Sequence, residues 1–218
     1  ILIYLIKYYM KTKVVVFGGS GFLGGHLSNL LADQNYEVSV FDKENYDKNK
    51  KINYIKGDIL DIQEVNKSIK NANYVFHFAG ISDIEQSNEN AFNTINQNIV
   101  GTTNILESCI KNKVKRFIFA SSIYIYTDKG GFYKVTKQAC ESIIRQYFEN
   151  YKLNFTIIRF GSIYGPKSNN LNFVHNIIKN ALTKGTMVRK GEGNEIRQYI
   201  HVADAANATI QLLDHKYS

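Results

Sequence analysis

The chain has 218 residues, of which 44% are apolar and 21% charged, a balance typical of folded globular proteins. Its net charge of +8 comes from 22 Lys and 5 Arg scattered along a chain with 24 Asn, without the focused basic stripe typical of nucleic-acid binding. We therefore expect no nucleic-acid partner, whereas the overall positive field favours an anionic substrate.

The chain begins with an apolar stretch, residues 1–9, that is too short to span a membrane and lacks the pattern of a signal peptide. Because Met10 looks like a natural start, we interpret residues 1–9 as an upstream extension. Beyond it, apolar runs rich in β-branched residues alternate with stretches of helical apolar spacing. The predicted strands are residues 14–17, 36–42, 52–56, 74–79, 116–121 and 154–160. The predicted helices are residues 22–31, 61–70, 93–111, 134–151, 172–184 and 203–213.

Strands that alternate with helices predict right-handed βαβ crossovers. The expected fold is therefore α/β, with a doubly wound, Rossmann-like parallel sheet and helices on both faces. We expect residues 10–166 to form this domain. After Gly165 and Pro166 the alternation loosens, and residues 187–200 are predicted to form a loop with short strands. Residues 167–218 are predicted to be a partial C-terminal lobe that looks truncated.

A glycine motif follows the first predicted strand and opens the first helix. Gly18 allows a tight turn, Gly21 lets a pyrophosphate approach the backbone, and Gly24 lets helix and strand pack closely. The phosphates would then lie at the positive end of the helix. Asp42 ends the next strand 18 residues after Gly24, where an acceptor for a ribose 2′-hydroxyl is expected. Because Asp42 would repel a 2′-phosphate, the motif favours NAD over NADP. The alternatives are that the glycines form only a glycine-rich turn and that Asp42 is a solvated carboxylate at the end of a strand.

A second motif, Tyr133-x-x-x-Lys137, lies at the start of a predicted helix, one strand–helix step after Ser122. The spacing of four places both side chains on one face. A free tyrosine has a pKa near 10, and we expect the nearby ammonium, with a cationic nicotinamide, to lower it. Tyrosine could then move a proton while a cofactor moves a hydride. The alternative is an exposed helical pair, since the chain holds 15 Tyr.

With these two motifs, further segments make residues 12–213 resemble the extended short-chain dehydrogenase/reductase family, in particular its nucleotide-sugar epimerases and dehydratases. The segments are Gly57-Asp58-Ile59, His77-Phe78-Ala79-Gly80, the run 98–104 that begins with Asn98, Ser121-Ser122 with the following run to Tyr126, the run 159–166 that begins with Arg159-Phe160-Gly161-Ser162, and the run 197–204 that begins with Arg197.

The resemblance implies a role for each matching residue. Ser122 would hydrogen-bond the reacting sugar group, Tyr133 would be the acid/base, and Lys137 would hold the nicotinamide ribose. Arg197 would pair with the substrate diphosphate. The cofactor-binding residues implied are Gly18, Gly21, Phe22, Leu23, Gly24, Asp42, Asp58, Ile59, Phe78, Ala79, Gly80, Asn98, Tyr133, Lys137 and Phe160. The substrate-binding residues implied are Ser122, Tyr124, Ser162 and Arg197.

The implied function is NAD-dependent epimerisation of a nucleotide sugar, similar to that of UDP-glucose 4-epimerase. Tyr133 would deprotonate a sugar hydroxyl, and the transient keto sugar would take the hydride back on its other face. Residues 10–166 would then bind NAD, and residues 167–218 would bind substrate. The alternatives are a net NAD(P)-dependent oxidoreductase on a sugar or another hydroxyl or keto substrate, and a non-catalytic NAD-binding module.

Three features depart from the family pattern. The connection between Tyr126 and Tyr133 is short, which leaves the sugar open. Ile123 and Tyr124 stand where dehydratases usually carry Asp-Glu, which argues against a 4,6-dehydratase. Ser162 stands where epimerases often have Asn.

Other residues are predicted to be structural. His77 ends a buried strand and His201 lies in an apolar stretch, so packing is the expected role of both. Tyr124 and Tyr126 are expected to alternate on a strand, with packing as their default role. Cys109 and Cys140 form no Cys-x-x-Cys pair and no cluster with histidine, so we expect neither a disulfide framework nor a metal site. A reducing cytoplasm fits this pattern best.

Family members often dimerise through two long helices, which correspond to residues 93–111 and 134–151. Apolar surface for a homodimer could come from Cys109, Ile110, Ile143 and Ile144. The alternative is that these residues pack on the sheet.

Overall fold

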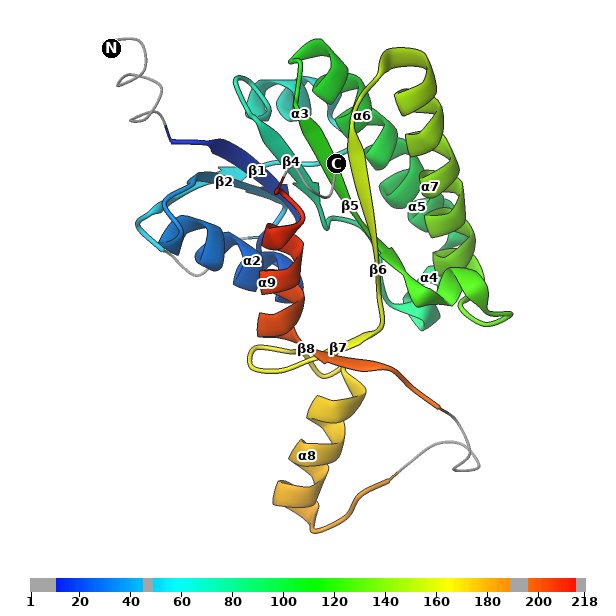
Figure 1. Cartoon of the computed structure of the whole chain (residues 1–218). Coiled ribbons are helices and arrows are strands. Elements are labelled where there is room, and N and C mark those ends of the chain that lie inside the picture. Colours follow the sequence, from blue (N-terminus) through cyan, green and yellow to red (C-terminus); the bar gives the residue numbers. More distant parts are fainter. Residues whose placement is uncertain (1–10, 45–48, 189–195, 215–218) are drawn as a thin grey trace.

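The computed structural model describes residues 11–44, 49–188 and 196–214. Six strands form one parallel sheet in the order β3-β2-β1-β4-β5-β6 (Figure 1). The strands are β1 (Lys13–Phe17), β2 (Glu37–Asp42), β3 (Ile52–Lys56), β4 (Tyr74–His77), β5 (Arg116–Ser122) and β6 (Phe155–Phe160). The order reverses between β1 and β4, and open α/β sheets bind ligands outside the carboxyl ends of strands at such a point. The predicted Rossmann-like fold is confirmed.

Helices cover both faces of this sheet (Figure 1). On one face lie α2 (Phe22–Asp33) and α9 (Val202–Gln211). On the other lie α3 (Ile62–Ser68), α6 (Gly101–Lys111) and α7 (Gly131–Tyr151). None of the helices that the structure describes is long and apolar enough to cross a membrane.

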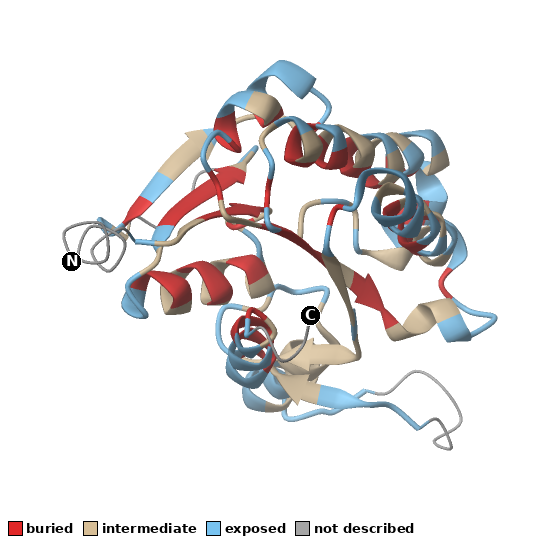
Figure 2. Cartoon of the chain, turned by 45° about the horizontal axis from the view of Figure 1, so that its top comes forward, coloured by how far each residue is buried: buried red, intermediate tan, exposed pale blue. Residues whose placement is uncertain are grey.

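The alternation of side chains along β1 explains the two layers of core. Val14 and Val16 are fully buried against α2 and α9, whereas Val15 and Phe17 are fully buried in the cluster that includes α6 and α7. Successive side chains on a strand point to opposite faces, so a continuous apolar run is what a strand covered on both sides requires. Figure 2 shows the buried faces of the helices turned toward the sheet.

The smaller elements were less accurately predicted. The expected helix 93–111 is three segments, α5 (Ala91–Ile95), the π-helix η1 (Asn96–Val100) and α6, and α4 (Ile84–Glu89) was not predicted. The expected strand position of Tyr124 and Tyr126 is wrong, since both lie in a 3₁₀-helix, η2 (Ile123–Tyr126). The reason is local: the Ser122 hydroxyl accepts a hydrogen bond from the Tyr124 N–H at 3.2 Å and turns the chain.

The helical residues proposed for a dimer surface pack inward. Cys109 and Ile144 are 0% and 1% exposed, and Ile110 and Ile143 pack against the same core cluster. The expectation that Cys109 and Ile144 supply apolar surface is therefore wrong. Their side chains fill the interface between helices and sheet instead.

The C-terminal part adds a second, two-stranded parallel sheet of β7 (Ser162–Tyr164) and β8 (Tyr199–His201). The helix α8 (Phe173–Lys184) projects from the body below these strands and has no buried residue (Figure 1). In contrast, α9 returns to the large sheet, where Ala206 and Ile210 are buried. The predicted lobe, residues 167–218, thus contains one helix that belongs to the main core. The predicted upstream extension, residues 1–9, lies outside the described residues.

The carboxylate of Glu141 on α7 ties three elements together. It accepts hydrogen bonds from Ser121 Oγ at 2.7 Å and from Arg159 Nε and Nη2 at 2.9 and 2.7 Å. Arg145 Nη2, one turn along α7, donates to it at 3.2 Å. Burial raises the pKa of the Glu141 carboxyl, but the hydrogen bonds from Arg159 and Ser121 outweigh this and hold the pKa below its usual value. β5, β6 and α7 are thereby fixed beside Ser122.

We expect Glu141→Gln to lower the free energy of unfolding at neutral pH by about 1–3 kcal/mol, because charge-assisted hydrogen bonds are lost. The folded-state pKa lies below the unfolded one, so this contribution is complete above the unfolded pKa and is lost as pH falls through the folded pKa. Urea unfolding should therefore show the difference between wild type and variant shrinking below about pH 4.5.

The matched control is Glu149→Gln, because Glu149 is exposed on the same helix. It should change the unfolding free energy by less than about 0.5 kcal/mol. A Glu141→Gln difference that stays constant down to about pH 3 would contradict the assigned role of the carboxylate.

Candidate active site

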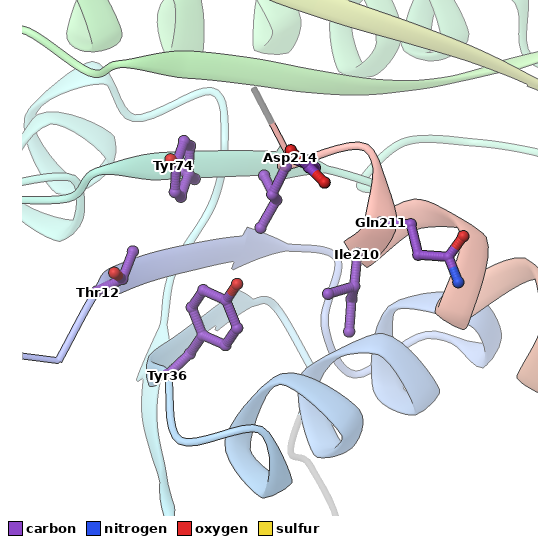
Figure 3. Close-up of a pocket in the computed structure, with 7 residues that line it drawn as sticks. Thr12, Tyr36, Tyr74, Ile210, Gln211 and Asp214 are labelled. Carbon is purple, nitrogen blue, oxygen red and sulfur yellow. The ribbon is translucent and has the colours of Figure 1, made fainter. Parts of the chain in front are cut away.

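A cavity of about 1440 Å³ opens at the carboxyl ends of β1, β4, β5 and β6. It is lined by the glycine motif, by the Tyr133/Lys137 pair and by residues around the start of α8. A second cavity of about 340 Å³ lies at the opposite edge of the sheet, where Thr12, Tyr36 and Tyr74 mark the amino ends of strands (Figure 3). The larger cavity holds the residues with acid/base and anion-binding chemistry, so we assign the candidate site to it.

The glycine motif forms a tight cradle at the rim of this cavity. Gly18 has φ +77°, and a Cβ there would lie 2.5 Å from the backbone nitrogen of Ala79. A Cβ at Gly24 would lie 2.2 Å from the carbonyl oxygen of Gly18. The first turn of α2 lines the cavity, and Gly21 precedes it without a side-chain cap. Uncapped N–H groups at a helix N-terminus suit a pyrophosphate.

Asp42 is held beside this cradle. Its Oδ2 accepts a hydrogen bond from the Ser20 N–H at 2.9 Å, and its Oδ1 accepts one from the Glu44 N–H at 3.1 Å. The carboxylate lines the cavity at the end of β2. The position fits an acceptor for ribose hydroxyls, and that role stays a prediction. Together with the glycine cradle, the residues present fit a dinucleotide.

The three predicted catalytic residues meet in the cavity. Ser122 ends β5, and Tyr133 and Lys137 lie on successive turns at the start of α7. The Ser122 hydroxyl lies close enough to the Tyr133 hydroxyl to lower the pKa of that phenol. Lys137 Nζ donates to the Ala120 carbonyl at 2.7 Å. The ring of Tyr124 packs edge-on against Tyr133, with 6.5 Å between centroids.

Burial dominates the titration of this group. It raises the pKa of Tyr133 above its usual value, although the nearby Ser122 hydroxyl lowers this pKa in part. Burial also lowers the pKa of Lys137, to about 8. In the protein without a nicotinamide, the Tyr133 pKa therefore lies above its usual value. The expected lowering by Lys137 together with a cationic nicotinamide stays a prediction. The Lys137 ammonium lies 5.8 Å from the Tyr133 ring centroid, and burial of the phenol is the largest influence on its pKa.

Most of the other predicted cofactor-binding residues also line the cavity. They are Phe22, Leu23, Ile59, Phe78, Ala79, Gly80 and Phe160. Two do not line it. Asp58 forms an ion pair with Lys43 at 2.9 Å.

Asn98, the second exception, lies behind the cavity wall. Its Oδ1 accepts from the Ile81 N–H at 2.8 Å, and its Nδ2 donates to the Ile81 carbonyl at 3.0 Å and to Thr136 Oγ1 at 2.9 Å. Asn98 thus fixes the loop after β4 that forms the wall. A cofactor contact by Asn98 itself stays a prediction.

The predicted substrate-binding residues Tyr124, Ser162 and Arg197 line the cavity as well. The Arg197 guanidinium lies 5.5 Å from the centroid of the ring of Phe173, the first residue of α8.

The two histidines expected to be structural, His77 and His201, do not line this cavity. His77 is 1% exposed and its Nε2 is 2.8 Å from Thr102 Oγ1. His201 caps the N-terminus of α9, because its ring Nδ1 accepts a hydrogen bond from the Ala203 N–H at 3.3 Å.

Sequence reasoning missed a polar wall around the start of α8. Asn172 caps this helix and donates through Nδ2 to the Ile163 carbonyl at 2.7 Å. An N-cap asparagine before an apolar helical stretch is a detectable signal, but its place beside the cavity depends on tertiary structure. Further cavity residues that were not anticipated are Ser20, Ser82, Asp83, Thr127, Lys129, Asn169 and Asn176.

Comparison with known proteins supports this assignment. UDP-N-acetyl-alpha-D-glucosaminuronate decarboxylase of Bacillus cytotoxicus is 28% identical, over 95% of this chain and 73% of the relative. UDP-glucose 4-epimerase of Thermotoga maritima with UDP-glucose superposes with a TM-score of 0.85 at 26% identity, over 93% of this chain and 73% of that one.

The UDP-glucose 4-epimerase of Thermus thermophilus, solved with NAD, has a TM-score of 0.81 at 27% identity, over 92% of this chain and 74% of that one. The model of the NAD dependent epimerase/dehydratase family matches residues 14–218. NAD is accordingly the cofactor that the cradle fits. The glycine motif, the Tyr133/Lys137 pair and the sheet order all lie within the matched residues. The chain therefore belongs to the NAD dependent epimerase/dehydratase family.

Proposed function

We propose that the protein epimerises a nucleotide sugar, in the manner of a UDP-glucose 4-epimerase, with NAD as its cofactor. The observation that carries the proposal is the meeting of Ser122, Tyr133 and Lys137 in one cavity with the glycine cradle. The similarity to epimerase structures solved with UDP-glucose or with NAD supports it. UDP-glucose and UDP-galactose are the substrates to test first.

The glycine motif and Asp42 would hold NAD, and Lys137 would bind its nicotinamide ribose. The cofactor supplies a reversible hydride acceptor, which a sugar carbon needs in order to invert without net oxidation. The first turn of α2 supplies N–H groups for the pyrophosphate. Phe78 and Phe160, whose centroids are 6.2 Å apart, supply an apolar wall that limits water.

Tyr133 would move the proton at the sugar hydroxyl. Its side chain and that of Ser122 line the same cavity, so the two hydroxyls would together bind the substrate oxygen. Burial raises the Tyr133 pKa in the site without cofactor, so the phenolate form needs a positive charge beside it. The positive charge on Lys137 would stabilise the phenolate that accepts the proton of the sugar hydroxyl, and the phenol would return this proton when the keto sugar is reduced again. Ser122 would hydrogen-bond the sugar oxygen throughout.

Arg197 would bind the substrate diphosphate. A guanidinium offers several donors in one plane, which matches phosphate oxygens. The Phe173 ring orients Arg197 on the cavity wall. With residues 10–166 as the NAD-binding part, the segment 167–218 would bring substrate contacts, and Arg197 would be one of them. Ser162, before this segment, would add a further contact.

A 4,6-dehydratase is less well supported by the site, even though dehydratases are among the relatives. Ile123 and Tyr124 line the cavity directly after Ser122. Neither side chain is a carboxylate, so neither supplies the acid/base pair that elimination requires. This observation favours epimerisation over dehydration.

The proposal includes a cytoplasmic homodimer. Cys109 and Cys140 form no Cys-x-x-Cys pair in the sequence, which fits a reducing compartment. Phe92 on α5 and Val135 on α7 are 77% and 52% exposed, which leaves apolar surface on the helices expected to dimerise. Light scattering on the eluting protein tests this part, and a monomer at micromolar concentration would contradict it.

The first experiment uses the purified protein without added cofactor. Denaturation and assay of released nucleotide would detect NAD that co-purifies, and a second sample would be incubated with UDP-glucose or UDP-galactose. Bound NAD with interconversion of the two sugars is the expected result. NADH accumulation with added NAD and a hydroxyl substrate would indicate a net oxidoreductase instead. NAD binding without turnover of any substrate would indicate a binding module.

We expect Tyr133→Phe to lower the interconversion rate about 10²–10⁴-fold, because it removes the proton-transfer oxygen. NAD affinity should change little, since the ring remains. Steady-state kinetics and calorimetric titration check the two parts. The control is Tyr151→Phe, because Tyr151 is 58% exposed at the end of α7. Unchanged turnover in Tyr133→Phe would contradict the assigned acid/base.

We expect Asp42→Asn to weaken the preference for NAD over NADP. The variant retains one acceptor for the Ser20 N–H but loses the charge, so NAD should bind about tenfold more weakly. NADP should bind more tightly than it does to the wild type, because repulsion of the 2′-phosphate is removed. Calorimetry with both nucleotides measures this. Asp33→Asn is the control, since Asp33 forms an exposed pair with Lys51. Equal NADP affinity in wild type and Asp42→Asn would refute the prediction.

A further inference from the structure

The ammonium of Lys137 is buried, and its contacts within the described residues are few. The residue is 7% exposed, and Nζ donates one hydrogen bond, to the Ala120 carbonyl at 2.7 Å. The same nitrogen lies 4.6 Å from the centroid of the Phe119 ring and 5.8 Å from that of Tyr133. Both distances are within the range in which an aromatic face attracts a cation.

Among the titratable groups around Lys137, Cys140 raises the Lys137 pKa, but burial lowers it by more. His77, on β4, is held neutral because burial lowers its pKa well below the usual value. On α7, burial raises the pKa of both the Cys140 thiol and the Tyr133 phenol. The carboxylate of Glu141 is committed to Ser121, Arg145 and Arg159.

Among the residues that the structure describes, no carboxylate lies within ion-pairing distance of Lys137 Nζ. A buried cation without a carboxylate loses its proton unless other groups stabilise the charge. Besides Cys140, the described groups near Nζ that stabilise the charge include the Ala120 carbonyl and the two ring faces. Phe119 is the nearer ring and has no polar atom of its own.

We propose that Phe119 is a positioning residue for the reaction: its ring face keeps the Lys137 side chain protonated and directed at the Ala120 carbonyl, at the wall of the cavity. The inference rests on the role given to Lys137 in the proposed function. Phe119 acts through Lys137, since it is not itself among the residues that line the cavity. No sequence motif points to it, because it is one of several apolar residues in β5.

The ring of Phe119 is held in a fixed orientation. It is 1% exposed and pairs in register with His77 on β4 and Ile157 on β6. The Phe117 ring lies nearly parallel to it, with 6.3 Å between centroids, and the His77 ring lies 5.6 Å away. Packing on three sides means that the face offered to Lys137 is preformed, so no ordering cost arises when the cofactor binds.

The test compares Phe119→Leu with Phe119→Tyr and with the matched control Phe117→Leu. Phe117 is equally buried in the same cluster and also contacts His77, but it makes no contact with the ammonium. The readout is the pH dependence of Lys137 acetylation by trace acetic anhydride, measured by mass spectrometry on the folded protein without added nucleotide. This readout does not require turnover.

In Phe119→Leu we expect the labelling midpoint to fall by about one pH unit, because the desolvated cation–π attraction is lost. Phe119→Tyr should keep the midpoint near that of the wild type, since a ring face remains. Phe117→Leu should also keep it, even though it loses similar core volume and stability. The turnover of Phe119→Leu should recover at lower pH, where Lys137 is protonated again.

An unchanged midpoint in Phe119→Leu would overturn the inference. So would an equal shift in Phe117→Leu, because the effect would then come from core packing. If the wild type shows no epimerase activity while Phe119→Leu shifts the labelling midpoint, the proposed function fails and the control of Lys137 by Phe119 stands. If Phe119→Leu does not fold, Phe119→Met provides a second variant of similar volume without a ring face.

Discussion

The close approach of the first strand–helix turn to the end of β4 is the constraint on which the rest of the site depends. Side-chain atoms at Gly18 or Gly24 would collide with backbone, so the turn exists in this form because both positions lack a Cβ. The approach aligns the start of α2 with the carboxyl ends of β1 and β4, where the sheet order reverses. An uncapped helix end, a switch point and a carboxylate at Asp42 are therefore brought to one place by backbone geometry.

The fold stabilises two buried charges beside the cavity, those of Glu141 and Lys137, in different ways. Glu141 is buried with several charge-assisted hydrogen bonds, so it stays ionised and locks β5, β6 and α7. Lys137, one turn earlier on the same helix, is buried with a carbonyl and aromatic rings instead. The first arrangement favours rigidity, because an ion pair with good geometry resists rearrangement. The second leaves the Lys137 pKa at about 8, so that its protonation can respond to a reacting group.

The sequence predicts the sheet, its helices and the meeting of Ser122, Tyr133 and Lys137, because strand periodicity, the glycine spacing and the order of elements are local or topological signals. The turn at Tyr124 was missed, since one hydroxyl-to-backbone hydrogen bond overrides an apparent strand alternation. The raised pKa of Tyr133 in the site without cofactor cannot be read from spacing, because desolvation depends on everything packed around the phenol. Phe119 carries no local signal at all. Spacing along the chain predicts which residues converge, whereas their electrostatics depend on burial.

The attachment of α8 has a consequence for motion. This helix buries no residue, while its N-terminal turn forms part of the cavity wall through Asn172, which is bonded to the Ile163 carbonyl. Few buried contacts mean a small free energy for local opening, so amide hydrogens of α8 should exchange long before those of β1 or β5. One wall of the site can then fluctuate on a fast timescale while the cradle and the Tyr133/Lys137 pair remain protected. Amide hydrogens around the Tyr133/Lys137 pair should thus exchange slowly, and those in the cavity wall formed by α8 should exchange rapidly.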